Sequence, residues 1–320
     1  MKKRAFILII IAGIMWGTTG IFVKFLAPYG FSSLQLTAVR ATASFLSISC
    51  YALLRHRKKF VFKPSELPVF LGMGITVFTT AAFYFVSMQA TSISTAVILM
   101  YTAPIYVMIF SVLAFKERFS SLKLISVAAM MLGCALVSGI IGGLRFDAFG
   151  IVMGVAAGLS YGAYNVFTKI SSRRGCDTLT ATLYAFLIMA TLAVSLSNPA
   201  EIITLTAKAP LVLIPSFIVF GIVTCFLPYF LYNLAMKDLP AGTASALGIV
   251  EPMAATVFSI VIFREKVTVF SVIGIALILT AVFLLGKAEN EKKQKLSLIE
   301  RKKRYEAFNN KRRACRKGRL

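Results

Sequence analysis

Long runs of apolar residues, about 20 at a time and almost free of charge, recur along this chain and constrain its fold more than any other feature. A run of that length crosses the hydrocarbon core of a bilayer as one α-helix. With 58% hydrophobic and only 15% charged residues, the chain has too little polar surface for a soluble globule. We therefore predict an all-α membrane protein. Its ten transmembrane helices are expected near 5–25, 33–54, 68–87, 94–114, 122–141, 148–168, 178–197, 210–232, 243–263 and 268–286.

Two of these predicted helices share a sequence pattern. Residues 95–118 read TAVILMYTAPIYVMIFSVLAFKER, and residues 243–266 read TASALGIVEPMAATVFSIVIFREK, 148 positions later. In this alignment Pro104 falls on Pro252. Each copy is a membrane-length run that ends in a charged group. The match indicates an internal duplication.

The duplication extends to other helices and divides the chain into two halves. At an offset of 145 positions, further residues match: Gly17 with Gly162, Lys24 with Lys169, and Tyr84 with Tyr229. Because each half has an odd number of helices, the second copy enters the membrane inverted, as in many secondary transporters. We therefore expect three parts: a five-helix repeat in 1–144, an inverted five-helix repeat in 145–286 and a basic tail in 287–320.

The 35 Lys and Arg residues are divided unequally between the two sides of the membrane. If the N-terminus is inside, the cytoplasmic segments hold 15 of them and the outer segments five, while Arg40 lies within the second helix. The other 14 are in the tail. The positive-inside rule then predicts a multi-pass protein of the cytoplasmic membrane with both termini in the cytoplasm.

The basic tail, 287–320, indicates the lipid bilayer itself as a partner. Basic residues near a membrane surface gain about 1 kcal/mol each from anionic lipid headgroups, so we expect the tail to bind anionic lipids. Nucleic-acid binding is not expected, because the only aromatic residues among the basic ones are Tyr305 and Phe308.

Few residues in this chain could carry metal or covalent chemistry. His56, the only histidine, sits in the basic loop sequence RHRKK, and the five cysteines are scattered without a CxxC pair. The sequence has no Walker A phosphate loop and no HExxH motif. We expect no metal, no cofactor and no enzyme activity; a membrane-embedded enzyme is the weaker alternative, because no cluster of His, Cys or carboxylate residues lies at membrane depth.

Glu251 is the acidic residue with the strongest functional signal. Of the twelve acidic residues it is the only one near the middle of a predicted helix. A carboxylate at that depth is costly and must pair, take up a proton or face water. Glu251 is therefore a candidate for proton coupling or for binding a substrate amine, and the alternative is a structural bond to a neighbouring helix. Arg40 is its candidate partner or an anion-binding group, unless the arginine reaches out to the headgroups.

Pro104 and Pro252 interrupt matching helices in the two halves. A proline inside a helix removes one backbone donor and disturbs the carbonyl four residues earlier, here those of Met100 and Gly248. Such carbonyls are tolerated in a bilayer only where protein or a water-filled cavity covers them. The two prolines indicate either packing kinks or the walls of a substrate cavity.

Aromatic and amide side chains provide further candidates for such a cavity, although each could instead anchor a helix at the membrane interface or pack against a neighbour. These residues are Trp16, Tyr84, Tyr101, Tyr161, Asn165, Tyr229 and Asn233. Glu117 and Glu265 lie beside basic residues at the ends of the two proline helices. We expect them to form helix-end ion pairs or to act as gates.

Four of these motifs together resemble the EamA family of the drug/metabolite transporter superfamily. They are Trp16-Gly17 in the first helix, Arg40 in the second, the Ala-Pro and Glu-Pro pairs, and the closing FKER and FREK sequences. The resemblance covers about 1–286. It implies a ten-helix bundle with a central cavity and secondary transport of a small metabolite, such as an amino acid or related organic solute, by an exporting permease. The alternative is a lipid translocator or a receptor-like scaffold.

Overall fold

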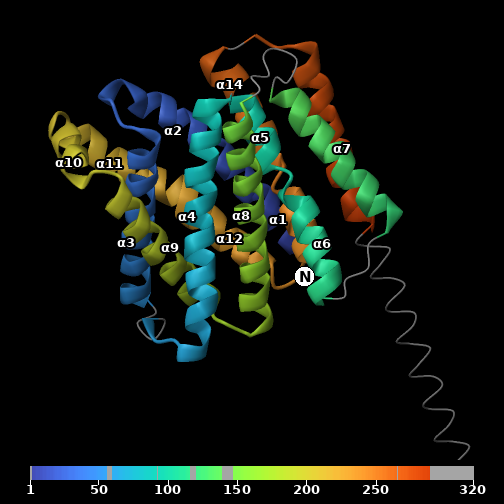
Figure 1. The fold of residues 1–320 in the computed structure, drawn as a ribbon, viewed down its shortest axis with the longest axis horizontal. Helices are drawn as coiled ribbons and strands as arrows, with labels where there is room; N and C mark the ends of the chain where they lie inside the picture. Colours follow the sequence, from blue (N-terminus) through green and yellow to red (C-terminus); the bar gives the residue numbers. More distant parts are fainter. Residues whose placement is uncertain are drawn as a thin grey trace, which may run out of the picture.

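The computed structural model describes residues 2–55, 60–91, 93–115, 120–138, 147–264 and 266–288, and it is a bundle of helices (Figure 1). Among the described residues, nine helices are long and apolar enough to cross a membrane. A shorter apolar helix, Ser121–Val137, completes a set of ten. The prediction of an all-α membrane protein with ten helices is therefore confirmed.

Several predicted spans are divided into shorter helices. The first half contains α1 (Lys2–Gly17), α2 (Thr19–Leu26), α3 (Ser33–Arg55), α4 (Leu67–Ala90), α5 (Ile93–Met100), α6 (Ala103–Phe115) and α7 (Ser121–Val137). The second half contains α8 (Ala148–Arg173), α9 (Thr178–Leu196), α10 (Pro199–Ala207), α11 (Pro210–Gly221), the π-helix η5 (Ile222–Phe226), α12 (Leu227–Ala235), α13 (Ala241–Leu247), α14 (Val250–Phe263) and a final helix, Val269–Ala288.

Side-chain caps explain where three of these helices begin. Asp147 Oδ1 accepts a hydrogen bond from the Gly150 amide at 2.7 Å, and Asp177 Oδ1 accepts from the amides of Leu179 and Thr180. Ser120 caps α7 in the same way. These side chains satisfy backbone donors that lack partners in the first turn, so α7, α8 and α9 start within one residue of the predicted positions.

Helix α10 was not predicted, because its nine residues are too short to be recognised as a span. Pro199 stands at its first position, where a missing amide hydrogen costs nothing. In Figure 1, α10 and α11 form one edge of the bundle, and α7 with the final helix forms the opposite edge. Between these edges α4 packs against α8, and α1 packs against α12 and α14.

Three glycines bring α8 very close to the first half. Gly150, Gly154 and Gly158 recur every four residues on one face of the helix. A Cβ atom on each would lie 2.5–2.7 Å from atoms of Thr91 or Leu99. Small residues at this spacing allow membrane helices to approach backbone to backbone. The glycine face of α8 thus fixes the contact between the two halves.

The two proline helices are broken, and this corrects one expectation. Helix α5 ends at Met100 and α6 begins at Ala103, while α13 ends at Leu247 and α14 begins at Val250. Both prolines therefore lie in the first turn of a new helix instead of inside a continuous one. That position accommodates proline because first-turn amides have no partner in the helix anyway. In both repeats the preceding helix ends a few residues before the proline.

Candidate functional site

The two broken helices meet in the interior through one hydrogen bond. Tyr101, which is 2% exposed, follows the last residue of α5, and Glu251 lies in the first turn of α14. The Tyr101 hydroxyl donates to Glu251 Oε2 at 2.6 Å. A hydrogen bond of this length to a carboxylate is of the strong, charge-assisted kind. It joins the breaks of the first and second repeats at a single point.

Two tyrosines and two asparagines connect α8 with α12 in a reciprocal pattern. The Tyr164 hydroxyl donates to Asn233 Oδ1 at 2.8 Å, and the Tyr232 hydroxyl donates to Asn165 Oδ1. Both tyrosines were missed in the sequence. A signal was present, because α8 and α12 each contain a Tyr-x-x-Tyr-Asn motif, at 161–165 and 229–233. Each motif supplies the donor for the asparagine of the other.

The amide nitrogens of these asparagines also donate one hydrogen bond each. Asn165 Nδ2 donates to the Tyr161 carbonyl at 2.6 Å, and Asn233 Nδ2 donates to Thr182 Oγ1 at 3.0 Å. Amides that both accept and donate in this way rigidify a buried interior. Asn165 and Asn233 therefore hold the helices around the cluster, and their predicted role as substrate ligands stays a prediction.

Aromatic rings fill the space between these hydrogen bonds. The Trp16 ring centroid lies 5.0 Å from that of Tyr229 and 5.5 Å from that of Tyr232. Tyr229 contacts Tyr164 edge to face at 5.4 Å, and Tyr101 faces Tyr161 at 6.4 Å. These are ordinary separations for favourable aromatic pairs. We call this connected set the polar cluster. It consists of Trp16, Tyr101, Tyr161, Tyr164, Asn165, Tyr229, Tyr232, Asn233 and Glu251.

Arg40 on α3 lies beside the polar cluster. Its charge acts on Glu251, Tyr229 and Cys225. Its Nε atom is buried and has no hydrogen-bond partner within the described part of the chain. Arg40 is half-buried, and its Nε atom lies in the protein interior, while the direct partner of Glu251 is Tyr101.

The structure places nine of the predicted cavity residues in or beside this cluster, although their action on a substrate is untested. They are Trp16, Arg40, Tyr84, Tyr101, Tyr161, Asn165, Tyr229, Asn233 and Glu251. Pro104 and Pro252 begin the adjoining half-helices. Glu117 and Glu265 lie outside the described residues. Among the residues that are described, no group of three or more metal-binding side chains is found.

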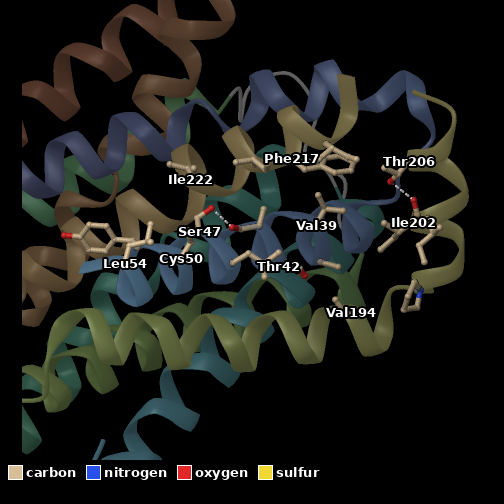
Figure 2. A pocket seen from close by; sticks show the side chains of 18 residues that line it. Val39, Thr42, Ser47, Cys50, Leu54, Val194, Ile202, Thr206, Phe217 and Ile222 are labelled. Atoms are coloured by element: carbon tan, nitrogen blue, oxygen red, sulfur yellow. Dashed lines mark hydrogen bonds between the residues drawn. The ribbon is translucent and has the colours of Figure 1, made fainter. Parts of the chain in front are cut away.

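A separate apolar groove opens on the membrane-facing side of the bundle (Figure 2). It has a volume of about 860 Å³ and lies between α3, the end of α9, α10 and α11. Figure 2 shows Val39, Thr42 and Leu54 on one wall and Phe217 and Ile222 on the other. None of its 18 lining residues is charged. The groove therefore suits hydrocarbon and does not suit a charged solute.

Among the described residues, nine membrane-length helices and one shorter apolar helix form two related halves, and their broken helices meet at an interior carboxylate. This arrangement is typical of inverted-repeat membrane transporters. The model of the EamA-like transporter family matches the chain twice, at residues 3–139 and 148–287. The protein belongs to this family of the drug/metabolite transporter superfamily.

Relatives and a solved structure agree with this assignment. An uncharacterized transporter of Archaeoglobus fulgidus is 27% identical over 288 residues, which cover 86% of this chain and 94% of its own. The uncharacterized transporter YwfM of Bacillus subtilis is 25% identical over 89% of this chain and 94% of its own. A crystal structure that is 17% identical superposes with a TM-score of 0.72, covering 89% of this chain and 96% of its own. That structural match supports the fold alone.

Proposed function

We propose that this membrane transporter is a secondary permease that exports a small organic solute, such as an amino acid or a related metabolite, across the cytoplasmic membrane. The observation that carries the proposal is the bond from Tyr101 to Glu251, which lies where the broken helices of the two repeats meet. Broken helices at the repeat interface are where inverted-repeat transporters bind substrates and coupling ions. Export is proposed from the family resemblance, and both termini are proposed to be cytoplasmic.

The chemistry of the polar cluster supports a polar organic solute. Glu251 supplies an acceptor for an amine or a site for a coupling proton, and Arg40 supplies the opposite charge across the cluster. The surrounding rings provide apolar walls for the rest of a small molecule. A lipid translocator is the second candidate, favoured by the apolar groove. A translocator must also move a polar headgroup, for which the groove offers hydroxyl groups but no charged side chain.

The experiment compares wild-type protein with Glu251→Gln in proteoliposomes. The solute is chosen by comparing metabolites between cells that lack and cells that overproduce the protein. Glutamine keeps the shape and can still accept from Tyr101, but it carries no charge and exchanges no proton. We expect normal folding and a rate at least about tenfold lower, because a lost interaction of about 1.4 kcal/mol already changes an equilibrium tenfold.

Glu201→Gln is the matched control, since Glu201 lies on α10 and accepts from Gln35 Nε2 away from the cluster. It should transport at the wild-type rate. If Glu251→Gln also has the wild-type rate and pH dependence, Glu251 has no part in transport. Flux is also compared in right-side-out and inside-out vesicles under solute gradients of either sign. The combination that drives flux gives the direction of transport.

A further inference from the structure

Two buried N–H groups beside the polar cluster have no acceptor within the described part of the chain. They are Nε1 of Trp16, whose side chain is 6% exposed, and Nε of Arg40. Both groups can only donate hydrogen bonds. A buried donor without an acceptor costs several kcal/mol in a membrane interior, where water is scarce. Such groups are expected where a ligand supplies the acceptor.

The two donors lie in the same part of the structure, around Tyr229. The Trp16 ring stands edge to face against Tyr229 at 5.0 Å, and the Arg40 charge acts on the same tyrosine. Arg40 also acts on Cys225, which lies one turn before Tyr229 in the π-helix η5. Helices α1 and α3, which carry the two donors, both pack against η5.

The backbone that carries Arg40 is held tightly. The Ser44 hydroxyl donates to the carbonyl of Arg40 at 2.7 Å and to the carbonyl of Gly221 at 2.8 Å. A Cβ atom on Gly221 would lie 2.6 Å from Ala43 Cβ and 2.9 Å from the Arg40 carbonyl oxygen. Helices α3 and α11 thus touch backbone to backbone at this turn. A fixed backbone favours a defined binding geometry for the guanidinium group.

The charges identify which kind of ligand fits these donors. An indole N–H and a guanidinium N–H, with one full positive charge between them, match the two oxygens of one carboxylate. The polar cluster has its own carboxylate, Glu251, whose Oε2 atom accepts from Tyr101. Within the described part of the chain neither Trp16 Nε1 nor Arg40 Nε has an acceptor, and a carboxylate of a bound solute would supply one.

We propose that Trp16 and Arg40 form a subsite for a carboxylate group of the transported solute. The inference rests on the proposed function and deepens it, because it assigns the carboxylate end of the solute to Trp16 and Arg40 and an amine at the other end to Glu251. The subsite selects solutes that carry a carboxylate over the same solutes without one.

Trp16 makes the test direct, because it is the only tryptophan in the chain and its emission reports on this subsite alone. The purified full-length protein in lipid nanodiscs is titrated with leucine, with 4-methylpentanoate, which lacks the amine, and with 3-methylbutylamine, which lacks the carboxylate. Inorganic phosphate at equal ionic strength is the fourth probe. A saturable change in Trp16 emission is expected with leucine and 4-methylpentanoate only.

Arg40→Lys tests the geometry, since lysine keeps the charge but loses the Nε donor and the planar fork. We expect the apparent affinity for 4-methylpentanoate to fall at least about tenfold, the size of one charge-assisted hydrogen bond. Arg174→Gln is the control. It removes one positive charge at an exposed position, where Arg174 donates to the Ser65 carbonyl at 3.3 Å, and it should leave the titration unchanged.

Three results would overturn the subsite: no saturable response to either carboxylate up to its solubility, an equal response to the amine or to phosphate, or an unchanged affinity in Arg40→Lys. The first two use wild-type protein and need no variant to fold. The titration is also independent of flux. If the titration fails but transport still depends on Glu251, only the carboxylate subsite is rejected. If Glu251→Gln transports at the wild-type rate, only the proposed role of Glu251 in transport is rejected.

Discussion

The two repeats share an order of helices but contribute different charges to the interior. At the 148 offset Glu251 of the second repeat matches Ala103 of the first, and at the 145 offset Arg40 of the first repeat matches Ala185 of the second. Both alanines are buried. Each repeat therefore supplies one charge where the other holds a methyl group. The duplication has produced one polar site between the halves instead of two equivalent sites.

Other matched residues are retained in both repeats but make different contacts. Lys169, 8% exposed, donates from Nζ to the carbonyls of Met236 at 2.8 Å and Leu239 at 2.6 Å, just beyond the end of α12. Its match, Lys24, is exposed, and its Nζ lies 3.9 Å from the ring centroid of Phe263. Matched residues of an inverted-repeat transporter are expected to make different contacts in any one conformational state, because the two repeats then adopt different conformations.

The prediction with the largest expected effect concerns the membrane topology of the two repeats. Lys63 and Lys208 are matched positions at the 145 offset, and five predicted membrane spans separate them. If the repeats are inverted, the two residues lie on opposite sides of the membrane. Reporter fusions active only in the cytoplasm should work at Lys63, and reporters active only outside should work at Lys208. Activity of one reporter at both positions would rule out the inversion.

The next largest effect concerns the two lysines. Lys169→Met removes two hydrogen bonds from a charged donor and leaves buried carbonyls without that partner, so we expect a loss of about 3 kcal/mol in stability. Lys24→Met removes one exposed cation–π contact, worth about 0.5–1 kcal/mol. Thermal unfolding of both purified variants in one detergent measures the difference. Equal shifts in Tm would show that the two lysines contribute equally to the stability of this state, against our expectation.

Hydropathy and the internal repeat were enough to predict the fold. Each long helix is apolar along most of its length, so windows of membrane-spanning size located all ten. The charged residues of the site were also found, because Glu251 and Arg40 stand out against apolar neighbours. The sequence could not give their partners. Tyr101 meets Glu251 only because two distant helices break at matching points.

Features that depend on packing were missed. Tyr164 and Tyr232 do not stand out in a chain with 11 tyrosines and 27 phenylalanines, and only their motif distinguishes them. The break after Met100 coincides with the close approach of Gly158, whose Cβ would lie 2.7 Å from the Leu99 carbonyl. The apolar groove lies beside the point where α3 and α11 touch at Gly221, far apart in the sequence. Local sequence carries none of this information.

A smaller effect is expected from a matched pair of glycines. A Cβ atom on Gly17 would lie 2.7 Å from Ala254 Cβ and 2.9 Å from the Ala255 amide, so Gly17→Ala should cost about 1–3 kcal/mol through overpacking. The same atom on its match, Gly162, would meet ordinary contacts at 3.5 Å or more. Gly162→Ala should be neutral or slightly stabilising, because alanine favours the helix. Thermal unfolding in detergent compares them, and a larger loss for Gly162→Ala would contradict the packing described.

The smallest effect is expected at Ala103, the match of Glu251, and it tests the comparison most directly. Ala103 is fully buried at the start of α6, so an added hydroxyl must find an acceptor nearby. The neighbouring Thr102 has one, since its hydroxyl donates to the Leu99 carbonyl at 2.6 Å, and a serine at 103 can bond back to the preceding turn in the same way. Ala103→Ser should therefore fold and transport within about twofold of wild type, a difference below about 0.5 kcal/mol. The measurement is solute flux in the proteoliposomes used for Glu251→Gln. If Ala103→Ser slows transport as much as Glu251→Gln does, the two repeats contribute equally to the site, and the division of charge between them is not what makes it work.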